Sequence, residues 1–152
     1  MILDAKLMFS EGQALTALAS IQKATNIIDL GSVAGKDAFG NTEMQSFPKE
    51  LTWFVNLEVA MVGAAAILTA KIVTGSAVDS SAITGSVQMA ELEFPALSAA
   101  GVKKAMKLDY AKLGRYLHVE YYGAPSAITS VTINSGLIHG YNDSEIKDKF
   151  QG

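Results

Sequence analysis

Apolar and polar residues alternate with a period of two along much of this chain, and this constrains the fold more than any other feature. In the segment 51–61, LTWFVNLEVAM, the residues of one alternate set are all apolar. They are Leu51, Trp53, Val55, Leu57 and Val59. Thr52, Asn56 and Glu58 fall on the opposite side. Because side chains alternate between the two faces of a β-strand, the pattern predicts a half-buried strand.

Segments of the same kind recur along the chain, separated by clusters of Ser, Gly, Asn, Asp and Pro. They cover residues 24–31, 66–74, 87–94, 102–110, 115–122 and 127–138. Short strands at this spacing predict an all-β sandwich or barrel of antiparallel strands. The short link between residues 61 and 66 favours a hairpin of the strands on either side. The segment 9–24 has some helical periodicity, but Ser10, Gly12 and Thr16 argue against a helix.

Composition excludes several classes of function. The chain has 152 residues, which fits one domain over residues 1–152. Its formal net charge of −3 lacks the basic excess of a nucleic-acid-binding protein. It has no cysteine, which excludes disulfides, zinc–thiolate sites and cysteine nucleophiles. The longest apolar run, residues 59–70, is shorter than the roughly 20 residues of a membrane helix. Asp4 and Lys6 interrupt the apolar start, which argues against a signal peptide.

The stretch GRYLHVEYYG, residues 114–123, holds most of the residue types that active sites use. On a strand, Tyr116, His118, Glu120 and Tyr122 share one face, and Leu117, Val119 and Tyr121 share the core face. A histidine and a carboxylate two residues apart could act as acid and base or bind a metal. The favoured interpretation is a polar row that faces solvent or another subunit and pairs with neighbouring strands.

The other candidate residues do not form a catalytic set. Glu91 and Glu93 lie on the same strand face, whereas paired glycosidase carboxylates flank a bond from opposite sides. His139 follows a strand and fits a turn. Lys103, Lys104 and Lys107 form the only basic cluster, which fits a lysine-protected strand edge or a contact with an acidic partner. Because there is no G-x-S-x-G motif either, we expect no catalytic, metal or cofactor residues.

Four segments, in order, resemble the capsid cement (decoration) proteins of tailed bacteriophages, of the Bordetella-phage type. They are MILDAKLMFSEGQALTA, TNIIDLG, EFPALSAAG and RYLHVEYY. Each segment alone is weakly specific, but the ordered set spans most of the chain and is more specific. The segment 36–50 and the turn 63–66 do not match the pattern of that family.

This resemblance implies a jelly-roll β-sandwich on the outside of an icosahedral shell. Such a protein would bind the major capsid protein, bridge neighbouring capsomers, self-associate as a homodimer at two-fold positions, and have no catalytic residues. We expect residues 1–20 to form an extended arm, residues 24–140 the sandwich and residues 141–152 a tail. The location expected is the outer capsid surface of the virion, after synthesis in the host cytoplasm. The candidate contacts with the capsid or another subunit are Ile2, Leu3, Leu7, Phe9, Phe39, Lys103, Lys104, Lys107, Tyr116, His118 and Tyr122.

Two other functions fit a β-sandwich of this size. A carbohydrate-binding module of a phage fibre or a lectin would need exposed aromatic rings, for which Tyr116 and Tyr122 are the candidates. A small hydrolase would need a nucleophile that the sequence does not display. We therefore expect a structural protein that binds neither nucleic acid nor membranes.

Overall fold

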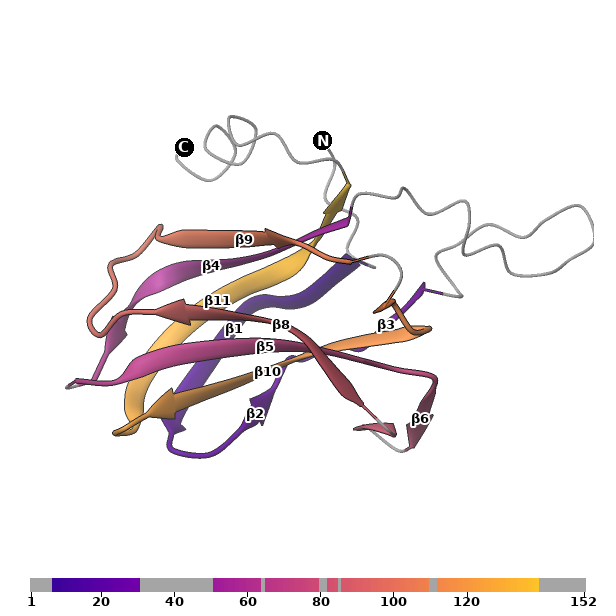
Figure 1. Ribbon diagram of the computed structural model, residues 1–152. Helices are drawn as coiled ribbons and strands as arrows, with labels where there is room; N and C mark the ends of the chain where they lie inside the picture. Colours follow the sequence, from indigo (N-terminus) through magenta and orange to yellow (C-terminus); the bar gives the residue numbers. More distant parts are fainter. Residues whose placement is uncertain are drawn as a thin grey trace, which may run out of the picture.

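The chain forms two antiparallel β-sheets that pack face to face (Figure 1). The structure, a computed structural model, describes residues 7–30, 51–63, 65–79, 82–84, 86–109 and 112–139. The strands of these residues are β1 (Met8–Leu18), β2 (Gln22–Lys23), β3 (Ile28–Asp29), β4 (Leu51–Val62), β5 (Ile67–Gly75), β6 (Ala77–Asp79), β7 (Ala82–Thr84), β8 (Val87–Phe94), β9 (Lys103–Lys107), β10 (Tyr116–Ala124) and β11 (Ile128–His139). None of the described segments forms an apolar helix long enough to cross a membrane.

Within each sheet, strands from the first half of the chain alternate with strands from the second half. The four-stranded sheet has the order β1-β11-β4-β9, and the five-stranded sheet has the order β2-β10-β5-β8, with β3 also paired to β10. Among the strands that the structure describes, the short β6 and β7 pair only with each other. The prediction of an all-β protein with two antiparallel sheets, consistent with a β-sandwich, is confirmed.

The predicted hairpin between segments 51–61 and 66–74 is wrong. β4 and β5 follow one another in sequence but belong to different sheets, and the turn between them carries the chain across the sandwich. Gly63 and Ala65 adopt positive φ angles of 150° and 53° in this turn. The alternation of β4 and β5 specifies that each has a core face, but it does not specify which strand lies beside it.

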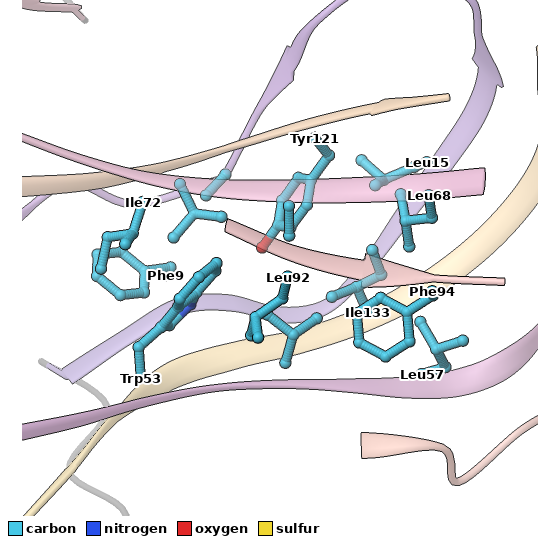
Figure 2. Close-up of a cluster of buried hydrophobic side chains, with 14 of the residues drawn as sticks. Phe9, Leu15, Trp53, Leu57, Leu68, Ile72, Leu92, Phe94, Tyr121 and Ile133 are labelled. Carbon is cyan, nitrogen blue, oxygen red and sulfur yellow. The ribbon is translucent and has the colours of Figure 1, made fainter. Parts of the chain in front are cut away.

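The core fills the space between the two sheets. Figure 2 shows aromatic and aliphatic side chains from both sheets meeting there. The labelled residues are Phe9, Leu15, Trp53, Leu57 and Ile133 of the four-stranded sheet and Leu68, Ile72, Leu92, Phe94 and Tyr121 of the five-stranded sheet. All of these side chains are buried, so the hydrophobic effect favours the stacking of the two sheets.

Hydrogen bonds satisfy the polar atoms that the central aromatic residues bring into the core. The indole Nε1 of Trp53 donates to Ser135 Oγ at 3.0 Å, and Ser135 Oγ donates to the carbonyl oxygen of Phe54 at 3.0 Å. The hydroxyl of Tyr121 lies 2.8 Å from Ser10 Oγ, which donates to Gln13 Oε1 at 2.6 Å. Because Ser10 has a single hydroxyl proton, Tyr121 is the donor in the bond between them.

The described part of the expected N-terminal arm is a strand. β1 pairs with β11 from Met8 to Leu18, so the four-stranded sheet includes residues that the sequence assigned to the arm. Phe9 and Ser10 both face inward because the register of β1 shifts between Met8 and Ser10 and again before Gln13. Ile2 and Leu3 lie outside the described residues.

A second apolar cluster lies on the outer face of the four-stranded sheet. It contains Met8, Phe54 and Ile138, with Ala105 packed against them. Thr52 and Asn56 share this face of β4 and are buried as well. The prediction that β4 is half-buried is therefore wrong over residues 51–57, where both faces of the strand are covered.

Candidate interaction surfaces

The polar row of β10 faces away from the core, as its alternation predicts. Leu117, Val119 and Tyr121 are fully buried, whereas Tyr116 and Tyr122 are partly exposed on the other side of the strand. β10 lies between β5 on one side and β2 and β3 on the other. Two of the predicted contact residues, Tyr116 and Tyr122, are therefore available on the outer face of the five-stranded sheet.

His118 does not face solvent, which corrects the prediction for this residue. Only 3 % of its surface is exposed, and its Nε2 lies 3.2 Å from the carbonyl oxygen of Ala24. The segment between β2 and β3 approaches the histidine because Ala24 also donates its amide to the carbonyl of Val119. A carbonyl oxygen can only accept, so Nε2 carries the proton and is not free to bind a metal or take up a substrate proton.

Burial also keeps the His118 ring neutral. Desolvation is the main cause of its lowered pKa, and nearby Lys23 lowers it further. The hydrogen bond to Ala24 and the charge of Glu120 act in the opposite direction but do not offset the burial. In the described part of the chain, no group of three or more His, Cys, Asp or Glu side chains is placed to hold a metal ion.

Charged residues beside Tyr122 form cross-strand contacts. Lys71 of β5 lies opposite Glu120 of β10 and Glu91 of β8. Its Nζ lies 3.6 Å from Glu91 Oε2 and 4.9 Å from the centre of the Tyr122 ring. Contact with Tyr122 is the largest cause of the raised Lys71 pKa; burial opposes it, and the charge of Glu91 adds a smaller increase. These contacts of Lys71 stabilise the pairing of β5 with its two neighbours, β8 and β10, on the outer face of the sheet.

The start of β10 is fixed by Arg115. Its Nε donates to Asp29 Oδ1 at 2.8 Å and its Nη2 donates to Asp29 Oδ2 at 3.0 Å, which ties β10 to β3. The guanidinium also lies 5.1 Å from the centre of the Tyr116 ring. Both exposed tyrosines of the β10 row therefore carry a cation next to the ring.

The basic cluster forms a sheet edge, as predicted. β9 holds Lys103, Lys104 and Lys107 and ends the four-stranded sheet. The Nζ of Lys104 lies 5.7 Å from the centre of the Phe94 ring. Lysines at such positions oppose uncontrolled strand addition. Whether β9 also contacts another chain stays a prediction.

The remaining predicted contacts are divided between the core and the undescribed part of the chain. Phe9 is fully buried, and Leu7 is partly buried against the core. β1 therefore does not present the Phe9 ring to a partner while it stays in the sheet. Phe39 lies outside the described residues, as does the side chain of His139.

The turn that follows β8 creates a surface feature that was not predicted from the sequence. A hollow of about 500 Å³ is lined by Ala65, Ile67, Glu93, Pro95, Ala96 and Lys104. Beside it, Leu97 is 67 % exposed at a φ of 58°, a backbone region that leucine rarely adopts. The segment FPALSAAG contained a signal for this site, because it places a leucine inside a turn.

Comparison with known proteins adds no relative to this picture. The models of known protein families contain none that matches this chain. No curated protein matches it significantly either. Function is therefore inferred from the strand order, the surfaces described above and the sequence segments.

Proposed function

We propose that this chain is a jelly-roll cement protein of a tailed-bacteriophage capsid. The observation that carries the proposal is the strand order. β2 and β3 count as one interrupted strand, because both pair with β10, and β6 and β7 form an added hairpin. Eight strands of the described residues remain, and the first pairs with the eighth, the second with the seventh, the third with the sixth and the fourth with the fifth.

This nested pairing supports a jelly roll. It arises when a long antiparallel ribbon is rolled up so that its successive strand pairs lie alternately in two sheets. Viral capsid proteins and lectins are among the proteins built in this way. Of these two classes, the sequence segments that resemble phage cement proteins favour the capsid.

The surfaces suit a protein that holds neighbouring subunits together. Apolar side chains are exposed at the end of the sandwich where β4 passes into β5, among them Val62, Ile67 and Leu97. Burial of such groups against another protein is favourable at roughly 25 cal/mol per Å². Many copies on one shell would add avidity, because each further contact forms at a high effective concentration. In this role the protein binds the major capsid protein from outside and bridges capsomers of the DNA-filled head.

The N-terminal arm belongs to this proposal in a shortened form. Because β1 starts at Met8 and Phe9 is in the core, an arm that reaches a neighbouring subunit would consist of residues 1–6. Its apolar contacts would be Ile2 and Leu3. Deletion of residues 1–6 leaves β1 intact, so loss of shell binding in this variant would assign that contact to the arm.

The decisive experiment mixes the purified chain with empty shells of the major capsid protein encoded in the same genome. We expect cryo-electron microscopy to show added density on the outer surface, bridging capsomers, and the coated shells to resist heating better than bare ones. Shells that remain bare at saturating protein would refute the proposal. Tyr121→Phe changes a buried core residue and no surface residue. It is therefore the control that separates a loss of shell binding caused by general destabilisation from one caused by a lost surface contact.

Carbohydrate binding is a second candidate, favoured by the position of Tyr116 and Tyr122 on the outer face of one sheet. The two residues are six positions apart on β10, which separates them by about 20 Å. Arg115 and Lys71 already lie next to the two rings, which leaves less ring surface for a sugar. A glycan array without hits would remove this candidate.

A further inference from the structure

Four loops meet at one end of the sandwich, away from the end where β1 begins. They follow β1, β4, β8 and β10, and strand pairing brings them together. Leu18 of β1 lies opposite Ile128 of β11. Ala124 of β10 lies opposite Ile67 of β5. We call this surface, at the left of Figure 1, the loop tip, and its described loop residues are 19–21, 63, 65–66, 95–102 and 125–127.

The loop tip has no charged and no aromatic side chain among these residues. Ala, Ser, Gly and Pro make up most of them. Charged residues are common on protein surfaces, and at the opposite end the loop between β9 and β10 contains Asp109, Lys112 and Arg115. Glu93 and Lys104, at the edge of the loop tip, belong to strands. The loop tip is therefore an uncharged surface formed by four loops.

Large apolar side chains are exposed at the loop tip. Ile21 and Leu97 lie in its loops. Val62 and Ile67 lie beside them, where β4 ends and β5 begins. Leu97 is 67 % exposed, the highest value of any large apolar side chain in the described part of the chain, and the hollow of about 500 Å³ lies beside it. Apolar surface gathered in this way marks interaction sites, whereas single exposed apolar residues do not.

Hydrogen bonds hold the turn that presents Leu97. The hydroxyl of Ser98 donates to the carbonyl oxygen of Pro95 at 2.7 Å. The amide of Met61 on β4 donates to the carbonyl oxygen of Ser98 at 3.0 Å. These contacts flank the positive φ of Leu97 and fix the turn to β4 with the leucine side chain outside. Strained residues of this kind collect at binding sites, and a turn that is already fixed loses little conformational entropy on binding.

We infer that the protein docks end-on, with the loop tip against an uncharged apolar surface of another protein and Leu97 in an apolar socket of that surface. The chemistry of the loop tip argues against other classes of partner. Nucleic acids and anionic membranes are bound through basic groups, which its described loops lack. Sugars are bound on exposed aromatic rings, which these loops lack as well.

The inference rests on the proposed function for the identity of the partner, the outer surface of the major capsid protein. It adds which end of the sandwich faces the shell and the chemistry of the contact, which the resemblance to cement proteins does not specify. Met8, where β1 begins, and His139, where β11 finishes, lie at the opposite end. In this orientation these two strand ends face away from the shell.

The test measures how tightly variants of the full chain bind the empty shells, by co-sedimentation. Leu97→Asp places a charge in the socket and should weaken binding by tenfold or more. Val87→Asp is the matched control, because Val87 is 64 % exposed on β8 at the opposite end, and it should leave binding unchanged. Higher salt should not weaken wild-type binding, since the contact has no ion pairs to screen.

A second measurement uses the absence of cysteine from the chain. A polyethylene glycol maleimide coupled to Ala99→Cys in the loop tip should block binding to shells. The same group coupled to Lys112→Cys, at the opposite end, should not. Cryo-electron microscopy of shells coated with the wild type should show the sandwich standing on its loop tip.

Thermal unfolding of every variant shows whether it is folded. Shells that the wild type leaves bare would overturn both the proposed function and the inference. If the wild type coats shells, the proposed function stands and the other results decide the inference alone. Equal binding by Leu97→Asp, an equal loss in Val87→Asp, weakening by salt, or binding by the protein modified at the loop tip would each overturn it.

Discussion

Removal of the Ser135 hydroxyl is the most informative single change in the core. Ser135 Oγ accepts the proton of the Trp53 indole and donates to the Phe54 carbonyl, each at 3.0 Å, and both side chains are fully buried. Ser135→Ala therefore removes two hydrogen bonds and leaves a buried indole N–H without its acceptor. The volume lost is a single oxygen atom, so the effect comes from hydrogen bonding and not from a cavity.

The size of the effect follows from these contacts. A typical hydrogen bond contributes about 1 kcal/mol net, and an orphaned buried donor adds a desolvation cost of about 1–3 kcal/mol. We expect Ser135→Ala to lower the free energy of unfolding by about 2–3 kcal/mol, with little change in the denaturant slope. For a domain of this size the melting temperature should fall by roughly 5–10 °C.

Urea unfolding followed by tryptophan fluorescence measures this directly, because Trp53 is the only tryptophan in the chain. The native emission should also move to shorter wavelength when the indole loses its hydrogen bond. Ser130→Ala, on the same strand at a partly exposed position, is the matched control and should stay within about 0.5 kcal/mol of wild type. A cost for Ser135→Ala as small as that of the control would refute the reasoning.

Three further predictions concern other parts of the sandwich. Because the folded state lowers the pKa of His118 below its ordinary 6.5, stability should be constant above that pH and fall as pH drops below it. The urea midpoint of a His118→Gln variant should decline less over the same range. Gly136→Ala should destabilise the fold by about 1–3 kcal/mol, since an added Cβ would lie 2.7 Å from Met8 Sδ and 2.8 Å from the Leu7 carbonyl oxygen; an unchanged melting temperature would contradict this. Leu97→Gly should raise the free energy of unfolding by up to about 1 kcal/mol, because glycine adopts the positive φ at this position without strain. Calorimetry measures the change, and a lower melting temperature would show that the leucine side chain stabilises the monomer.

Sequence patterns predicted the strands and their core faces well. The alternation of Leu51, Trp53, Val55 and Leu57 places these residues in the core, as the structure confirms. Val59 continues the pattern in sequence but is exposed, because a register shift against β11 turns the strand after Leu57. A bulge of this kind depends on the partner strand, which alternation alone does not specify.

The environment of the outer faces could not be predicted from local patterns. The alternation of β10 placed His118 on the outer face, but its burial results from the segment around Ala24, which is distant in sequence. Phe54 likewise reads as an isolated apolar residue on a polar face until Met8 and Ile138 join it in the folded sheet. The hollow beside Glu93 and Lys104 needs β5, β8 and β9 together, so only the tertiary structure places its lining residues side by side.

The pairing of the first strand with the last determines how the sandwich responds to force. Met8 lies opposite Gly136 and Leu18 lies opposite Ile128, so β1 starts at the end of the ladder where β11 finishes. Tension applied through these two strand ends would act at one end of the ladder and open it one residue pair at a time. A pull along the strands, applied through the sides of the sandwich, would instead act on many hydrogen bonds at once, since these lie perpendicular to the strands. In the proposed role on a capsid, contacts on the flanks of this protein would restrain a swelling shell more firmly than a tether at its termini.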